Sequence, residues 1–165
     1  MLLPKQIVAL GKIVARAAGR LGLSTVRIER HERGPRAMAT DGRRAVLFQW
    51  DEPDADKYPA IEGLSPKPVR QFAANVPPKA LADAGRGVAK RTPNPVLKHL
   101  LLDESDAAMV KVAATANDNV TRAQAQAVDG NFPDCDSVLP VPAREGKLYN
   151  RQSTGLLRSP TRASA

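Results

Sequence analysis

The N-terminal segment carries an apolar stripe with a helical period. Its members recur at spacings of three, four, four and three residues: Ile7, Leu10, Val14, Ala18 and Leu21. Pro4 suits the first turn of a helix, and Gly22 suits its C-terminal end. The pattern therefore predicts an amphipathic helix over residues 5–21.

Most of the remaining chain alternates apolar and polar positions, which is typical of strands. The predicted strands cover residues 24–31, 36–40, 43–50, 69–76, 96–103, 107–116 and 119–127. Asp41-Gly42 lies between two of them and indicates a tight hairpin. Residues 51–68 are acidic and contain prolines, so we expect a loop there.

A second helix is predicted over residues 78–90, and its sequence resembles that of the first. Pro78-Lys79 aligns with Pro4-Lys5 at an offset of 74, and the shared pattern is P-K-x5-G-[KR]-x-V-A-[KR]. This similarity predicts an internal duplication. The alternative is a coincidence between two alanine-rich helices.

Basic residues outnumber acidic ones and are concentrated in parts of the chain. The 165 residues include 25 Lys and Arg against 17 Asp and Glu, and the formal net charge is +8. The segment 141–165 alone holds five basic residues and one acid, and its composition predicts disorder. Such clustering favours a polyanionic partner, although a basic surface without a partner is the alternative.

The cations of both predicted helices repeat at the same spacing. Lys5, Lys12 and Arg16 lie seven and four residues apart, opposite the apolar stripe, and the second helix repeats this spacing. A solvated face usually mixes signs, so a row of one sign favours contact with a phosphate backbone. The predicted DNA-binding set is Lys5, Lys12, Arg16, Arg20, Lys79, Arg86 and Lys90.

Two longer motifs point to a known family. They are A-T-D-G-R-R-A-V at residues 39–46 and V-D-G-N-F-P-D-C-D-S-V-L-P at residues 128–140. Together with the helix that opens at Val76-Pro77-Pro78-Lys79, they resemble the bacterial sliding clamp, the beta subunit of DNA polymerase III, and specifically its central domain. The resemblance covers residues 5–140.

The resemblance implies a single α+β clamp domain. Its duplicated βαβββ-like units would cover about residues 1–66 and 67–140, followed by the basic tail 141–165. Helices on one face of antiparallel sheet would face duplex DNA, and binding would be independent of sequence. The protein would be a non-catalytic processivity factor without a cofactor, located in the cytoplasm.

The family also binds short peptides of polymerases, clamp loaders and repair proteins. The positions that match its peptide pocket are Leu23, Thr40, Gly42, Arg43, Arg44, Ala45 and Pro140. Ala45 is smaller than the aliphatic residue usual there, which implies a shallower pocket. The alternative for residues 40–44 is a plain hairpin turn.

The length departs from the family, because a clamp chain has three such domains and two chains close the ring. A one-domain chain would need about six copies to build the same ring by closed symmetry. The alternative is a truncated relative that binds peptides without encircling DNA. We expect a functional clamp relative to be a homo-oligomer, whereas a truncated relative should be a monomer or an aggregate without a ring.

The sequence offers no catalytic or metal-binding pattern. Asp134-x-Asp136 lacks a third ligand, so we interpret both residues as turn formers. Cys135, His31 and His99 have no partners in a nucleophile pattern. We also expect no signal peptide and no membrane span.

Overall fold

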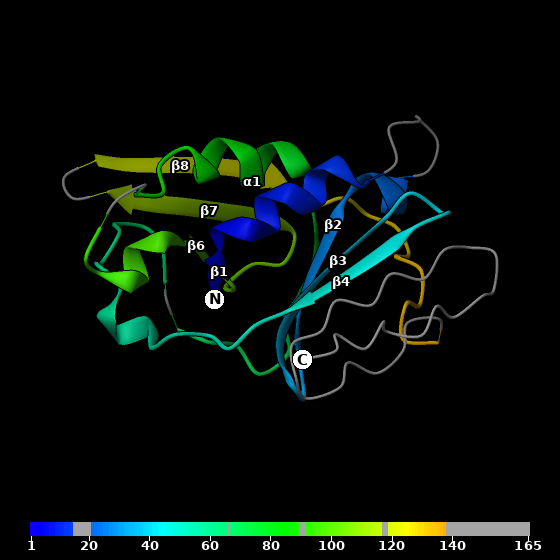
Figure 1. Cartoon of the computed structure of the whole chain (residues 1–165), viewed down its shortest axis with the longest axis horizontal. Coiled ribbons are helices and arrows are strands. Elements are labelled where there is room, and N and C mark those ends of the chain that lie inside the picture. Colours follow the sequence, from blue (N-terminus) through cyan, green and yellow to red (C-terminus); the bar gives the residue numbers. More distant parts are fainter. Residues whose placement is uncertain (15–20, 66, 90–91, 117–118, 138–165) are drawn as a thin grey trace, which may run out of the picture.

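The strands form two four-stranded antiparallel sheets, of order β1-β6-β7-β8 and β4-β3-β2-β5 (Figure 1). The computed structural model describes residues 1–14, 21–65, 67–89, 92–116 and 119–137. The strands are β1 Leu2–Pro4, β2 Val26–His31, β3 Gly34–Thr40, β4 Ala45–Gln49, β5 Ala73–Val76, β6 His99–Leu102, β7 Met109–Ala116 and β8 Asn119–Gln126. The predicted α+β class is confirmed, with the strands divided between two sheets.

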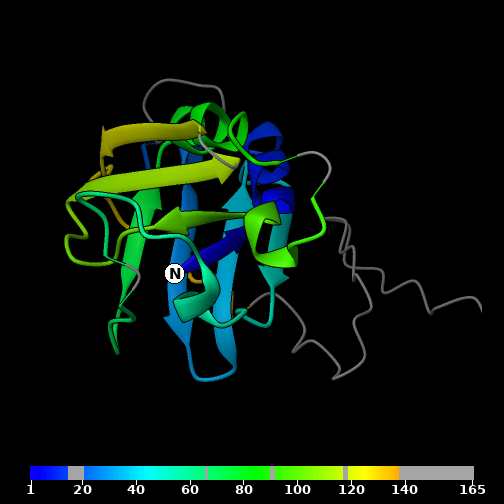
Figure 2. The ribbon, with the colours of Figure 1, turned by 90° about the vertical axis from the view of Figure 1, so that its left-hand side faces the viewer.

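Short helices connect these strands. They are the α-helix α1 Pro78–Gly85 and the 3-10 helices η1 Lys5–Lys12, η2 Leu21–Ser24, η3 Ala55–Lys57 and η4 Pro95–Lys98. α1 lies over β7 and β8, with η1 beside it (Figures 1 and 2). Among the described residues, no helix combines the length and the apolar character that crossing a membrane requires.

The element order repeats, and each half places its first strand in the sheet of the other half. β1 pairs with β6, with Leu3 opposite Leu100, while β5 pairs with β2, with Val76 opposite Val26. Each sheet is then completed by the three strands that follow one helix. This exchange ties the two halves into one unit.

Both long helices end earlier than the sequence predicts, and residues 15–20 of the first predicted helix lie outside the described residues. η1 ends at Lys12, where Ile13 N–H donates to Leu10 O at 2.9 Å, an i to i−3 bond that tightens the turn. α1 ends at Gly85, and the next three amides also bond three residues back. Glycine disfavours helix, which explains why the second helix stops short of residue 90.

Three strand predictions also need correction. β5 begins at Ala73, later than predicted, and residues 95–98 form η4 because Asn94 caps them by accepting from Val96 N–H. β1 was not predicted, because a three-residue strand has too few positions to show alternation.

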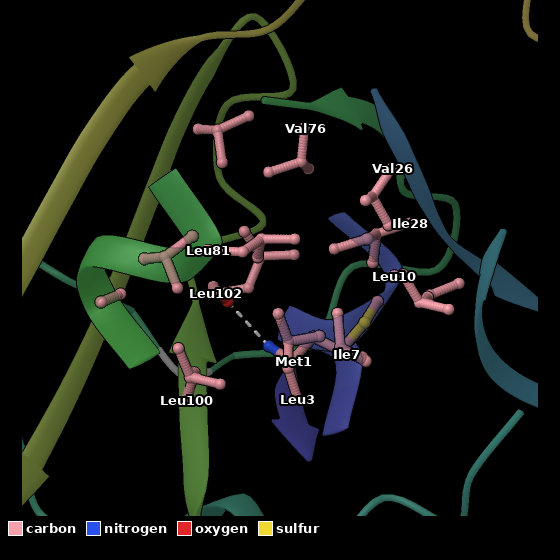
Figure 3. Packing of buried hydrophobic residues seen from close by; sticks show 14 of the residues in the cluster. Met1, Leu3, Ile7, Leu10, Val26, Ile28, Val76, Leu81, Leu100 and Leu102 are labelled. Atoms are coloured by element: carbon pink, nitrogen blue, oxygen red, sulfur yellow. Dashed lines mark hydrogen bonds between the residues drawn. The ribbon is translucent and has the colours of Figure 1, made fainter. Parts of the chain in front are cut away.

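The main core lies between the inner faces of the sheets and the two helices. Figure 3 shows Met1, Leu3 and Ile7 facing Leu81 and Leu102 there. A second apolar cluster covers the outer face of the β1-β6-β7-β8 sheet. Its members are Leu2, Tyr58, Ile61, Val96, Leu101 and Ala113.

The two helices touch through the duplicated glycines. A Cβ on Gly11 would lie 2.9 Å from Pro78 Cβ, and one on Gly85 would lie 2.8 Å from Val8 Cγ2. The shared glycine of the sequence pattern therefore permits the close contact between η1 and α1.

A buried ion-pair network joins the two sheets at the base of the core. Glu104 is fully buried and accepts both Nε and Nη2 of Arg30 at 2.6 Å. The α-amino group of Met1 lies 2.8 Å from the same carboxylate, and Glu52 accepts Arg30 Nη1 at 2.8 Å. Burial raises the pKa of Glu104, but the hydrogen bonds from Arg30 and the amino group outweigh it and hold that pKa below its usual value.

Candidate functional site: basic helices and the outer face of the β2-β3 sheet

Four of the predicted DNA-binding cations fall on described residues, and all four are exposed. They are Lys5 and Lys12 of η1, Lys79 of α1 and Arg86, which caps α1. Because η1 and α1 pack against each other, these cations belong to one pair of adjoining helices. Arg16, Arg20 and Lys90 lie outside the described residues.

Asp83 lies between the two cations of the second helix. Lys79 Nζ donates to Asp83 Oδ2 at 2.7 Å, and Arg86 Nη2 lies 3.4 Å from Asp83 Oδ1. The hydrogen bond from Lys79 is the main reason that the pKa of Asp83 is lowered. The row of positive charge is therefore partly neutralised at this point.

The predicted peptide-binding hairpin is a tightly bonded turn. Asp41 Oδ1 accepts the backbone N–H groups of Arg43 and Arg44, and Asp41 Oδ2 accepts the Arg44 guanidinium. The backbone N–H groups of Arg44 and Arg43 are the main cause of lowering the pKa of Asp41 to about 2. Thr40 is buried and bonds the turn backbone, accepting from Gly42 N–H and donating to Arg44 O.

The other predicted peptide-site residues are only partly brought together. Ala45 pairs with Thr40 across β3 and β4, so both side chains lie on the outer face of this sheet. Leu23 is half-buried in η2, and Arg43 is exposed. Pro140 lies outside the described residues. Arg44 pairs with Asp41 rather than with the acidic loop that follows β4.

A cavity of about 280 Å³ lies beside this face, between β2, β3 and the segment 130–136. Its strand residues alternate with core residues, so they point away from the helices. The lining consists of Arg27, Glu29, Arg36, Met38, Gly130, Asn131, Phe132, Pro133, Asp134, Cys135 and Asp136. None of the described residues of the predicted peptide site lines it, although Met38 and Thr40 share one face of β3.

The segment 130–136 is bonded to the sheet at both ends. Arg36 Nη1 and Nη2 donate to the two oxygens of Asp136 at 2.6 and 2.7 Å, while Arg36 Nε donates to Glu29. Asn75 Nδ2 donates to Gly130 O at 2.9 Å. The Arg36 hydrogen bond lowers the pKa of Asp136, and the Asp136 hydrogen bond raises that of Arg36.

Sequence reasoning missed this site because Arg36 and Asp136 are 100 residues apart. Asp134 does form the predicted turn, since its Oδ1 accepts Asp136 N–H at 3.0 Å. Cys135 is buried, and this burial and the adjacent Asp136 and Asp134 raise the pKa of its thiol. In the described part of the chain, no three His, Cys, Asp or Glu side chains form a metal-binding group.

The arrangement of these elements is similar to that of solved DNA polymerase sliding clamps. The clamp of Bacillus subtilis superposes with a TM-score of 0.55 at 18% identity, over 85% of this chain and 32% of the clamp. The DNA polymerase III beta subunit of Caulobacter crescentus gives 0.56 at 20%, over 86% and 35%. That of Streptococcus pyogenes gives 0.55 at 17%, over 86% and 34%.

The class of protein that this fold defines is a sliding-clamp-like domain. No protein-family model and no curated protein matches the sequence, so the likeness rests on the fold. The resemblance to the sliding clamp that was inferred from the two motifs is confirmed at the level of the fold. The chain spans about a third of the length of the clamps to which it is similar.

Proposed function

We propose that this protein is a non-catalytic clamp-like factor that associates with duplex DNA through η1 and α1 and tethers DNA polymerase, clamp-loader or repair proteins. The single observation that carries the proposal is the set of exposed cations on two helices that pack side by side. The fold is similar to that of solved sliding clamps of DNA polymerase, which supports the same function.

The contacts would be with phosphates. Lys and Arg side chains on a helix surface neutralise phosphate charge without reading bases, so binding would be independent of sequence and would weaken with salt. Log affinity falls with log salt by about 0.9 for each phosphate that is neutralised. Four such cations lie on described residues, and Asp83 competes for two of them.

The test replaces the exposed helix cations by glutamine in one variant: Lys5, Lys12, Lys79 and Arg86. A control variant replaces four exposed cations elsewhere by glutamine: Lys57, Lys67, Arg70 and Lys98. Both variants lose the same net charge. Fluorescence anisotropy with a labelled duplex, measured across a salt series, should show near-complete loss of binding and a reduced salt slope only in the first variant.

Equal losses in both variants would mean that net charge alone drives the association. In that case the helix face would have no special role, and the DNA proposal would be wrong.

The second candidate is an interaction module that binds peptides without encircling DNA. The observation that favours it is the outer face of β3. There Thr40, Met38 and Arg36 lie in sequence between the hairpin turn at Asp41 and the cavity. This candidate predicts no duplex binding by the unmodified protein at low salt. The same anisotropy experiment therefore separates the two.

A further inference from the structure

The duplication supplies two equivalent segments, each of which covers the outer face of one sheet. The first strap, residues 54–63, lies on the β1-β6-β7-β8 sheet. The second strap, residues 128–137 and orange in Figure 1, lies on the other sheet. At the offset of 74, Tyr58-Pro59 of the first strap aligns with Phe132-Pro133 of the second. The two straps are therefore equivalent in sequence position and in their place on the fold.

Apolar burial holds the first strap on its sheet. Tyr58 and Ile61 are 6% and 4% exposed and pack in one cluster with Leu101 of β6. The Tyr58 hydroxyl also donates to His99 O at 3.2 Å. Lifting this strap would bring an aromatic ring and a branched aliphatic side chain into water, so we expect it to open only when the whole fold unfolds.

Apolar contacts hold the second strap much less. Phe132 is half-buried, has no hydroxyl and belongs to neither apolar cluster of the described residues. Cys135 aligns with Ile61 and is buried, but its side chain is smaller and also lies outside both clusters. A cavity of about 280 Å³ remains between this strap and strands β2 and β3. Because dispersion contacts are lost across a void, packing contributes little to keeping this strap closed.

An ion pair holds the second strap instead. Arg36 Nη1 and Nη2 donate to the two carboxylate oxygens of Asp136 at 2.6 and 2.7 Å, which is the bidentate geometry of a strong charged hydrogen bond. The Arg36 side chain is 8% exposed, whereas that of Asp136 is 58% exposed. At the equivalent position the first strap has Glu62, which is exposed and forms no ion pair with any described residue. Charge therefore does for the second strap what apolar burial does for the first.

The other end of the second strap is fixed at β5. Val128 N–H donates to Asn75 O at 3.0 Å, and Asn75 Nδ2 donates to Gly130 O at 2.9 Å. Gly130 has a φ of 139°, in the region that favours glycine. Beyond Gly130, the hydrogen bonds that join the strap to other described residues all come from Arg36. Residues 131–137 can therefore leave the sheet when that pair breaks, while Asn75 keeps the start of the strap in place.

We propose that the second strap opens independently of the rest of the fold, and that the Arg36–Asp136 pair is the latch that closes it. Opening uncovers Arg27 of β2 and Met38 of β3, and Met38 lies next to Thr40 on the same face of β3. The latch thereby sets how much of this face a partner can contact. The latch itself involves neither DNA nor peptide, and only its consequence for a partner rests on the tethering part of the proposed function.

Cys135 provides the measurement, because it is the only cysteine of the chain and is buried in the second strap. The full chain is treated at pH 7 with the uncharged reagent N-ethylmaleimide, and alkylation is followed by mass spectrometry. Each rate is divided by the rate of the same variant unfolded in urea, which removes differences in thiol reactivity. In the unmodified chain, the rate should depend only weakly on urea below the unfolding transition, since a local opening exposes little surface. A rate with the full urea dependence of global unfolding would overturn the proposal.

Two matched variants test the latch. Asp136→Asn should raise the normalised rate about three- to fivefold without steepening its urea dependence, as expected for a partly exposed ion pair. Glu62→Gln removes the equivalent carboxylate of the first strap and should react as the unmodified chain does. Equal rates for the two variants would show that the pair does not close the strap. A faster rate of Asp136→Asn that follows global unfolding would also reject the latch, because the pair would then stabilise the whole fold.

Salt gives an independent check on the same samples. Raising sodium chloride from about 0.05 M to about 0.5 M should speed alkylation of the unmodified chain by screening the pair, and should leave Asp136→Asn unchanged. Equal salt effects on both proteins would contradict the role of charge in closing the strap. Duplex binding is measured separately by anisotropy. An independent latch in a chain that does not bind duplex would reject the DNA proposal alone, and the reverse result would reject the latch alone.

Discussion

Asp83 shows how one side chain can limit a surface formed by several others. It is the only acidic residue in α1, and it forms ion pairs with both Lys79 and Arg86. A phosphate that approaches this helix must compete with a carboxylate that is already 2.7 Å from the lysine ammonium. The positive row predicted from spacing is thus weaker than a count of cations suggests.

We predict that Asp83→Asn strengthens duplex binding by about two- to fivefold at low salt, since exposed pairs of this kind are worth about 0.2–1 kcal/mol. The salt dependence should also become steeper, because two released cations can neutralise phosphates. Anisotropy titrations measure both quantities. Asp51→Asn, which removes an exposed carboxylate from the loop after β4, is the matched control and should have a smaller effect.

At the scale of elements, the contact between η1 and α1 depends on the absence of side chains at two positions. The duplicated glycines lie where a Cβ would overlap the opposite helix. The overlap at Gly11 involves Pro78, whose ring is fixed, whereas that at Gly85 involves the end of the Val8 side chain. The two glycines are therefore equivalent in the sequence pattern but differ in how well each position accommodates a side chain.

Gly11→Ala should lower the free energy of unfolding by about 1–3 kcal/mol, as expected for overpacking. Gly85→Ala should cost less, because Val8 can move. Urea denaturation followed by circular dichroism measures both, with Gln6→Ala on the exposed side of η1 as the control. A larger loss for Gly85→Ala than for Gly11→Ala would contradict this account of the helix contact.

The network around Glu104 joins elements of both sheets and makes stability depend on pH. The pKa values of Glu104, Asp136 and Asp41 are all lowered in the folded protein. Such groups stabilise the fold above the unfolded carboxyl pKa near 4, and this stabilisation is lost as the pH falls through the lower folded values. The melting temperature should therefore fall between about pH 4 and pH 2.

Glu104→Gln should lower the free energy of unfolding by about 3–5 kcal/mol at pH 7, because it leaves the Arg30 guanidinium without its buried counter-charge. It should also reduce the fall in melting temperature at acidic pH, because one of the carboxyl groups that cause this fall is removed. Thermal unfolding from pH 2 to pH 7 measures both effects. Glu62→Gln, an exposed carboxylate in the loop after β4, should leave the curve unchanged.

At the scale of the whole molecule, the strand β8 forms one edge of its sheet. β8 pairs only with β7 among the described residues, and it is eight residues long with its outer positions exposed. An edge of this kind is a template for pairing with another chain. Val120, which is 44% exposed, lies on this strand and carries no charge.

We predict that the protein forms a defined oligomer at moderate salt, with about six copies if it closes a ring like that of the family it resembles. Val120→Lys should shift the population towards monomer, because a charge on an edge strand opposes pairing. Val69→Lys is the control, since Val69 is similarly exposed but outside every strand. Multi-angle light scattering decides the matter, and a clean monomer of the unmodified chain would favour the interaction module.

The sequence by itself determined features that depend on neighbours along the chain. The periods of 3.6 and 2 located both helices and most strands, Asp41-Gly42 located the hairpin, and the repeated pattern indicated duplication. These features are local, so propensity and periodicity suffice to specify them.

Only the tertiary structure decided which distant residues meet. The exchange of β1 and β5 between halves, the burial of Glu104 beside Arg30 and the Arg36–Asp136 pair all join residues that are far apart in the sequence, and Arg36 and Asp136 are separated by 100 positions. No pattern within a helix or strand specifies such contacts, because burial and charge pairing select them only once the sheets have assembled. The cavity under the segment 130–136 is of this kind, since residues of β2 and β3 form it together with a segment about 100 positions later in the chain.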